Sequence, residues 1–436
     1  MSATHAAIVS GAGGEARPVP LFPVYALSFL ASVGTGLVNN GIYLLADKAY
    51  GLSDAGMFGL GAVLGVTYVG AALGAGPVIR KVMRAHPAVS TRLVLLGVMI
   101  FMGLLCFLPF VARAMSGQAG QGLPAVWPLW VLVGLYSPLS GMLWPIVESY
   151  LSGGRRGASL RRAVSGFNVV WSSALVFAFF ALAPFLEHRS IEAIGVLGVL
   201  HVASVLLLIP LTREPARHEE DHEPCPASYP LLLTAFRLLL ATGYLVLCSI
   251  TPYFPTTLAE LQIPPNLEAI VAAAWLVARC GSFIVLERWH GWHGKWSTPA
   301  VGGGLILLGF GLAIFAASVA REMESLWLGR AQFVLGQALL GVGLAIIYSG
   351  ALYYAMAVGN AEVDAGGKHE ALIGGGYTIG PLCGLVAITL APGAFAPIML
   401  AMVSGIALAV TGSAAWRISR HWKAARQTHS LPKAPT

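Results

Sequence analysis

The stretch GMLWPIVESYLSGGRRGASLRRAVSGFNVVW (residues 141–171) joins two apolar runs through Glu148 and four arginines. An apolar run of about 18 residues or more can cross the roughly 30 Å hydrocarbon core of a bilayer as a helix. Inside lipid each backbone amide needs a partner within its own segment, so such runs must be helical. Charge concentrated between two of them therefore predicts a loop at a membrane surface.

The composition extends this prediction to the whole chain, because 57% of the 436 residues are hydrophobic and only 10% are charged. A soluble domain carries about 25% charged residues. The first twenty residues also lack the charged-then-apolar order of a signal peptide, so the first span is expected to remain in the mature protein. The sequence predicts an all-α polytopic membrane protein with twelve spans, at residues 21–46, 56–79, 92–113, 125–148, 163–184, 191–211, 231–254, 267–287, 298–319, 327–357, 371–392 and 394–416.

The basic residues predict the orientation. When the connectors are assigned alternately to two sides, most of the 26 lysines and arginines fall on the side of the N-terminus. Cytoplasmic loops of membrane proteins carry the excess of such residues. We therefore expect both termini to be cytoplasmic, in the plasma or inner membrane, and the four arginines of residues 141–171 to determine topology.

The stretch TREPARHEEDHEPCPAS (residues 212–228) is polar and too short to be a domain, which is typical of a linker. A short internal repeat also favours two related halves: FFALAP ends at Pro184 and AITLAP ends at Pro392. The predicted organisation is an N-terminal tail (1–20), a six-helix bundle (21–211), a cytoplasmic linker (212–230), a second six-helix bundle (231–416) and a C-terminal tail (417–436).

With these twelve spans, GPVIRKVMR (residues 76–84) and FIVLERWHGWHGK (residues 283–295) resemble the loop signature of the major facilitator superfamily. The first copy has Gly76, Lys81 and Arg84 in place but Arg80 where that family has an acid. The resemblance implies two six-helix bundles that rock about a central cavity, lined by spans 1, 4, 7 and 10 and flanked by spans 2, 5, 8 and 11. It also implies secondary active transport of a small solute.

The most specific candidate for contact with such a solute is Arg279, which lies about two-thirds along the eighth span. An arginine at mid-helix costs roughly 2.5–3.5 kcal/mol on insertion scales and should face protein or water. Trp275 and Phe283 lie four residues to either side and are expected to flank it. No acidic residue is expected at its depth, so an anionic or zwitterionic solute would supply the counter-charge. The alternative is that Arg279 extends toward the membrane surface or bonds to carbonyls and polar side chains of neighbouring helices.

Three further spans carry polar or aromatic residues on shared helical faces. Each group suits either a cavity wall or a contact between helices, and tyrosines can also mark the membrane interface. The predicted substrate-binding residues, besides Trp275 and Arg279, are Asn39, Asn40 and Tyr43 in the first span, Asn168 and Trp171 in the fifth, and Ser349 and Tyr353 in the tenth.

Charged residues near the predicted cytoplasmic helix ends suggest a gate. In this hypothesis the carboxylates pair with arginines while the cavity faces outward, and a carboxylate or histidine takes up a coupling proton. The alternative is ordinary interfacial charge, worth under about 1 kcal/mol per exposed pair. The predicted gate and coupling residues are Glu148, Arg161, Arg162, His369 and Glu370.

Other classes of function receive less support. The five cysteines fit no metal spacing, no catalytic constellation or phosphate-binding loop is apparent, and the net charge of +7 follows the membrane loops rather than a nucleic-acid surface. We therefore expect no enzyme activity, cofactor, metal or nucleic-acid partner, and we expect a small-molecule substrate, the lipid bilayer and a coupling proton or ion as partners. The alternatives are efflux of amphipathic compounds and a non-transporting sensor or scaffold on the same fold.

Overall fold

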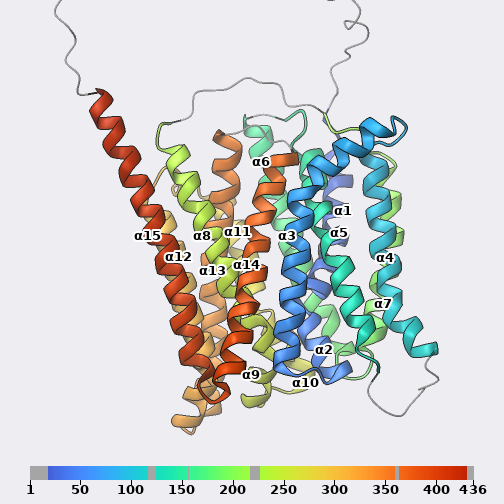
Figure 1. Cartoon of the computed structure of the whole chain (residues 1–436), viewed down its shortest axis with the longest axis vertical. Helices are drawn as coiled ribbons and strands as arrows, with labels where there is room; N and C mark the ends of the chain where they lie inside the picture. Colours follow the sequence, from blue (N-terminus) through green and yellow to red (C-terminus); the bar gives the residue numbers. More distant parts are fainter. Residues whose placement is uncertain (1–17, 116–123, 156, 217–225, 359–362, 430–436) are drawn as a thin grey trace, which may run out of the picture.

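A computed structural model describes residues 18–115, 124–155, 157–216, 226–358 and 363–429. These residues form long helices that lie side by side, with turns and no β-strand among them (Figure 1). The first part of the chain contains α1 (Leu21–Thr35), η1 (Gly36–Asn40), α2 (Ile42–Tyr50), α3 (Asp54–Ala85), α4 (Thr91–Met115), α5 (Trp127–Ser152), α6 (Gly157–Leu182), η2 (Ala183–Phe185), α7 (Ser190–Ser204) and η3 (Val205–Leu208).

The second part contains α8 (Tyr229–Ile250), η4 (Thr251–Tyr253), α9 (Phe254–Glu260), α10 (Pro265–Ala272), α11 (Ala274–Arg288), α12 (Ser297–Glu322), α13 (Leu326–Val358), α14 (Val363–Leu390), η5 (Pro392–Ala394) and α15 (Phe395–His429). In the described residues, twelve helical stretches are long and apolar enough to cross a membrane. The predicted fold class, an all-α membrane protein with twelve spans, is confirmed.

Several helices extend beyond their predicted ends. α5 continues to Ser152, so Glu148 lies a full turn inside it, and α14 begins at Val363, two turns before Glu370. α15 runs to His429 instead of ending near residue 416. The predicted linker between the halves falls partly on residues 217–225, outside the described part of the chain.

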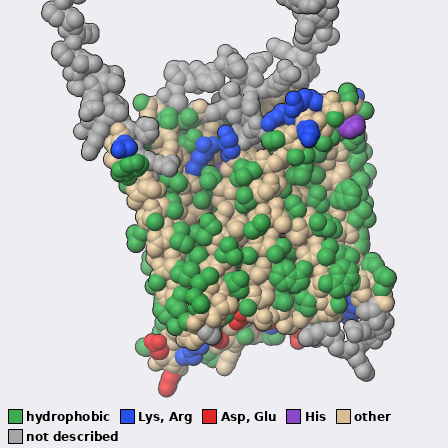
Figure 2. Space-filling model, viewed as in Figure 1, with side chains coloured by type: hydrophobic (Ala, Val, Ile, Leu, Met, Phe, Trp, Pro, Cys, Tyr) green, Lys and Arg blue, Asp and Glu red, His purple; other side chains and the backbone are tan. Residues whose placement is uncertain are grey.

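The two ends of the bundle differ in charge. We call the upper end in Figure 1, where Pro18 and His429 lie, the terminal end, and the other the opposite end. On the face drawn in Figure 2, the lysine and arginine side chains gather mainly at the terminal end and the acidic ones at the opposite end. At the terminal end, Arg155 of the opening stretch is 6% exposed, and it donates hydrogen bonds to the carbonyls of Leu151 (2.7 Å) and Val19. This arginine therefore ties the end of α5 to the start of the chain.

The first six spans meet the last six chiefly where α14 lies against α3 and α5, and where α6 lies against α11. Glycines bring these backbones close together. A Cβ on Gly65 of α3 would lie 2.3 Å from the carbonyl carbon of Tyr377 in α14, and one on Gly376 would lie 2.6 Å from the amide nitrogen of Leu245 in α8. α14 is therefore held tightly between α3 and α8, as small residues at membrane helix contacts allow.

Because the atoms facing Gly65 are backbone atoms, we expect Gly65→Ala to lower the free energy of unfolding by about 1–3 kcal/mol, the usual cost of overpacking. The matched control is Gly70→Ala on the same helix, where a Cβ meets nothing within 4 Å. There the better helix propensity of alanine should leave stability unchanged or raise it by up to about 1 kcal/mol. Thermal unfolding of the purified protein in detergent measures both, and equal melting temperatures would contradict the tight contact.

Candidate functional site

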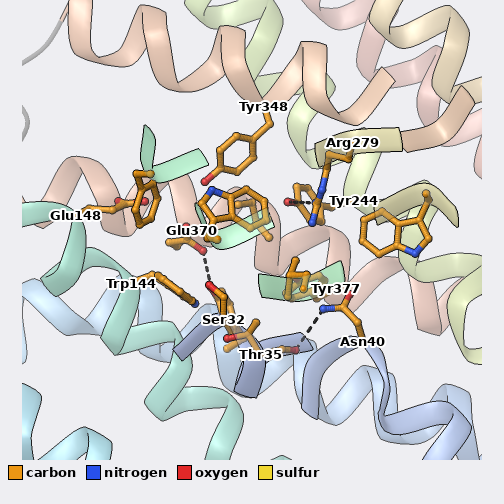
Figure 3. Close-up of a pocket in the computed structure, with 16 residues that line it drawn as sticks. Ser32, Thr35, Asn40, Trp144, Glu148, Tyr244, Arg279, Tyr348, Glu370 and Tyr377 are labelled. Carbon is orange, nitrogen blue, oxygen red and sulfur yellow. Dashed lines mark hydrogen bonds between the residues drawn. The ribbon is translucent and has the colours of Figure 1, made fainter. Parts of the chain in front are cut away.

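A central cavity lies where eight spanning helices converge, with an empty volume of about 540 Å³ that includes space open to solvent. Spans 2, 5, 8 and 11 therefore contribute to its wall directly, together with spans 1, 4, 7 and 10. The lining residues are Ser32, Thr35, Asn40, Tyr68, Trp144, Glu148, Phe167, Trp171, Leu175, Tyr244, Trp275, Arg279, Tyr348, Glu370, Ile373 and Tyr377 (Figure 3).

Arg279 is 2% exposed, and aromatic groups surround it. Its guanidinium carbon lies 4.6 Å from the ring centroid of Trp171 in α6 and 4.6 Å from that of Trp275 in α11. One guanidinium nitrogen donates to the hydroxyl of Tyr244 at 3.4 Å, whereas the Nε–H has no partner in the described part of the protein. Two cation–π contacts thus hold the charge in place while part of its hydrogen-bonding capacity stays unused.

Phe283, the other predicted neighbour of Arg279, instead packs against Trp171, with ring centroids 5.6 Å apart. Trp171 also contacts Tyr348 at 5.2 Å, and Phe283 contacts Tyr348 at 5.8 Å. These three rings form one cluster beside the arginine, rather than two rings flanking it along a single helix.

A break in the eighth span sets the position of Arg279. α10 ends at Ala272 and α11 begins at Ala274, and the buried amide of Gln337 in α13 donates to the carbonyl of Val271 at 3.1 Å just before the break. A Cβ on Gly341 would lie 2.1 Å from the carbonyl oxygen of Trp275, so α13 presses closely on this turn. The Gln337 amide thus gives a backbone carbonyl beside the break a partner within the protein, as backbone irregularities at membrane depth require.

The first span is also irregular, and this changes which of its residues face the cavity. Gly36–Asn40 form a π-helical turn, a feature frequent at functional sites, and Asn40 lines the cavity while its amide donates to the carbonyl of Thr35 at 3.3 Å. Asn39 is 5% exposed and outside the lining, with no partner for either amide atom among the described residues. Tyr43 is likewise buried away from the cavity, with its hydroxyl facing Gly61. The sequence prediction assumed a regular helix, in which Asn39 and Tyr43 share the functional face.

The cavity also contains two carboxylates. Glu148 and Glu370 both line it, and Glu370, 5% exposed, accepts a hydrogen bond from the hydroxyl of Tyr68 at 2.5 Å. Figure 3 shows them toward one side of the cavity, with Arg279 and Tyr244 toward the other. Glu148 and Glu370, which the sequence places near the ends of their spans, share this cavity with Arg279, because α5 and α14 are longer than predicted and carry these residues inward.

The predicted gate arginines do not pair with the two carboxylates in this conformation. Arg161 and Arg162 are both exposed, Arg161 at the edge of a second cavity, and no ion pair joins either one to Glu148 or Glu370 in the described residues. His369 is 2% exposed and lies edge-on to Tyr348 at 5.1 Å, with both ring nitrogens unpartnered within the described part of the chain. The two carboxylates face the central cavity and not the arginines, because α5 and α14 continue past them.

Of the remaining predicted site residues, Asn168, Ser349 and Tyr353 line the second cavity. Sequence reasoning missed six of the eight aromatic residues of the central cavity, which are Tyr68, Trp144, Phe167, Tyr244, Tyr348 and Tyr377. The four tyrosines lie within apolar spans, where a hydroxyl needs a partner. That requirement is the signal that would have pointed to them.

Contacts between early and late segments close the opposite end of the bundle. The Lys48 ammonium lies 2.9 Å from a carboxylate oxygen of Glu268, whose side chain is 3% exposed. Nearby, the hydroxyl of Thr256 donates to Asp54 at 2.5 Å. These polar contacts join α2 to α10 and α3 to α9, so this end is shut in the present conformation.

Removing the lysine leaves the Glu268 carboxylate buried and unpaired. We expect Lys48→Met to lower the free energy of unfolding by about 2 kcal/mol, between the values for exposed and for fully buried pairs, since Lys48 is 24% exposed. The double variant Lys48→Met with Glu268→Gln removes both charges and should recover most of that loss. An unchanged melting temperature in the single variant would show that the pair does not hold this end closed.

No protein-family model and no curated protein matches the chain. Among solved structures, a point mutant of the nucleoside transporter NupG matches with a TM-score of 0.63 and 11% sequence identity, covering 90% of this chain and 98% of that one. The structure of nucleoside transporter NupG itself matches with a TM-score of 0.61 and 12% identity over the same shares. The chain therefore has a fold like that of a solved membrane transporter along nearly its whole length.

Proposed function

We propose that the chain is a secondary active transporter that moves a small zwitterionic solute across the membrane by alternating access. The observation that carries this proposal is the content of the central cavity: one buried guanidinium, Arg279, and two carboxylates, Glu148 and Glu370. No ion pair joins Arg279 to either glutamate in the described residues. A cationic group and two ionisable carboxyl groups therefore line one cavity without an ion pair between them.

The balance of these charges selects the class of solute. A guanidinium binds a carboxylate or phosphate through a planar fork of donors. A solute with only an anionic group would gain this contact but meet repulsion from Glu148 and Glu370, whereas one that also carries a cationic group would pair with both sides. The anionic or zwitterionic preference suggested by Arg279 alone is thereby narrowed to zwitterions.

The position of the cavity between the early and late helices supports alternating access. Lys48 with Glu268 and Thr256 with Asp54 close one end, and the cluster of Trp171, Phe283 and Tyr348 lies toward the other. Each closure involves few side chains from opposite parts of the chain. Rocking of the two halves would break one closure while keeping the other, as in transporters with related halves.

Coupling to a proton follows from the same three charges. With both carboxylates ionised, Arg279, Glu148 and Glu370 sum to one negative charge, and one added proton makes the site neutral. Two carboxylates in one buried site repel each other, so their proton occupancy responds to a cationic group nearby. We propose that a proton binds to this pair when the solute leaves and departs when the solute binds.

The orientation proposed is that both termini face the cytoplasm of the plasma or inner membrane. The basic side chains at the terminal end in Figure 2 support it, because cytoplasmic surfaces carry the excess of lysine and arginine.

A second candidate is transport of a ring-containing or amphipathic solute. Eight aromatic side chains line the cavity, which is more than a small aliphatic zwitterion needs. Flat rings stack favourably on such residues. Nucleosides belong in the test for this reason, and because two solved structures of similar fold are named as those of a nucleoside transporter.

The test begins with thermal unfolding of the purified protein in the presence of amino acids and betaines, simple carboxylates, nucleosides and amphipathic cations. A ligand at about 100 times its Kd stabilises by about 2.7 kcal/mol, which shifts the melting temperature measurably. We expect zwitterions to stabilise and simple carboxylates not to. The best compound is then used for uptake into proteoliposomes.

In that uptake assay Arg279→Gln should lower transport at least about tenfold, because a charge-assisted hydrogen bond is worth about 1.5–3 kcal/mol. Glu370→Gln leaves only Glu148 for the cationic group and removes one site for the proton, so uptake should lose its dependence on a pH gradient. The control is Arg321→Gln, which removes a surface arginine that pairs with Glu260 at 3.2 Å and lies away from the cavity. Normal uptake by Arg279→Gln would overturn the proposal.

A further inference from the structure

A second cavity lies between the central cavity and the terminal end, with an empty volume of about 520 Å³ that includes space open to solvent. Its walls come from α6, α11, α13 and the connector between α11 and α12. Arg161, Ser165 and Asn168 line it from α6, Glu287 from α11, and Ser349 and Tyr353 from α13.

Its charged groups resemble those of the central cavity. Arg161 and Glu287 stand on different helices, and neither takes part in an ion pair within the part of the chain that the structure describes. His293, whose ring stacks on Tyr353 with centroids 4.1 Å apart, lies in the connector outside the spans. Burial, with the nearby His290 and Arg161, lowers the pKa of His293 to about 4. This histidine is therefore neutral at pH 7, and Arg161 supplies the positive charge.

Three rings separate the two cavities. Trp171 and Tyr348 line the central cavity, Phe283 lines the second one, and the three pack on one another with centroids 5.2–5.8 Å apart. Behind these rings lies a second compartment that contains a basic and an acidic side chain. Neither the sequence pattern nor the central site predicts this compartment.

Trp171 contacts residues of both cavities. Its ring lies over the guanidinium of Arg279 at 4.6 Å, and its indole N–H donates to the side-chain oxygen of Asn168 at 3.1 Å. Asn168 itself lines the second cavity. A polar group that binds Asn168 there competes directly with the hydrogen bond that holds the Trp171 ring in place.

We propose that the second cavity is a separate binding site for a zwitterionic solute, with Arg161 for its anionic group and Glu287 for its cationic group, and that Trp171 is the movable partition between this site and Arg279. The identity of the solute class rests on the proposed function. A solute bound at the second site engages Asn168, the indole is released, and the way to the central cavity opens.

Cysteine accessibility tests the partition without any transport assay. In a background whose five native cysteines are replaced by alanine or serine, Ser349→Cys reports on the second cavity and Thr35→Cys on the central one. The purified protein is treated with the cationic reagent trimethylammonioethyl methanethiosulfonate. We expect Ser349→Cys to react at least about tenfold faster than Thr35→Cys, as a closed partition requires.

Adding Trp171→Ala should raise the rate at Thr35→Cys by about tenfold and leave that at Ser349→Cys nearly unchanged. The matched control is Trp275→Ala. This change removes the other ring that lies 4.6 Å from Arg279 and leaves the three rings of the partition in place. Equal acceleration by the two tryptophan variants, or a fast reaction at Thr35→Cys with Trp171 present, would overturn the role of Trp171.

The binding site is tested by protection of Ser349→Cys against the same reagent. Glycine betaine, a small zwitterion, should slow the reaction at least about threefold, whereas choline and acetate, which carry one charge each, should not. Arg161→Gln and Glu287→Gln should each abolish the protection. Equal protection by choline or acetate, or none by betaine, would refute a zwitterion site here.

Failure of the second site can be told apart from failure of the proposed function. Protection and partition can fail while uptake still depends on Arg279, in which case only the second site is wrong. If both hold while no compound is transported, the second site stands and the proposed transport activity is wrong.

Discussion

The stacking of Arg279 between Trp171 and Trp275 is the interaction on which the interior of this protein depends. A guanidinium at membrane depth is costly unless protein groups replace its water. Here the two rings come from α6 and α11, one from the early and one from the late part of the chain, at 4.6 Å each. Part of the stabilisation of this charge therefore depends on the two parts meeting, which couples their relative position to the contents of the cavity.

The same contact connects the site to its surroundings. Trp171 also packs on Phe283 and Tyr348 and is held by Asn168, so the ring that stabilises Arg279 divides the two cavities. Two departures from regular helix geometry accompany the polar groups that face inward. They are the π-helical turn Gly36–Asn40 and the break at Ala273, beside which the Gln337 amide donates to a backbone carbonyl. Such irregularities are tolerated in membrane helices where the protein satisfies the freed backbone groups.

Hydropathy predicted the number and order of the spans because burial in lipid requires long apolar helices whatever the tertiary arrangement. It also identified Arg279, since any charge in the middle of an apolar run stands out. It misplaces the ends of α5 and α14 and so puts Glu148 and Glu370 at the ends of their spans rather than within the helices. Hydropathy averaged along the sequence drops at a carboxylate and therefore predicts the end of a span there. A helix with one face toward a polar cavity can nevertheless continue past the carboxylate.

The sequence by itself determined the all-α fold, the twelve spans and the presence of a buried cation, since these follow from length, apolarity and the energetic cost of charge in lipid. Only the tertiary structure decided which polar residues meet. Asn40 rather than Asn39 faces the cavity, Glu370 shares a compartment with Arg279, and Arg161 lies in a second cavity. The physical reason is that helix rotation and depth depend on contacts between distant residues, such as Gly65 against Tyr377 and Gly341 against Trp275. No local pattern records these contacts.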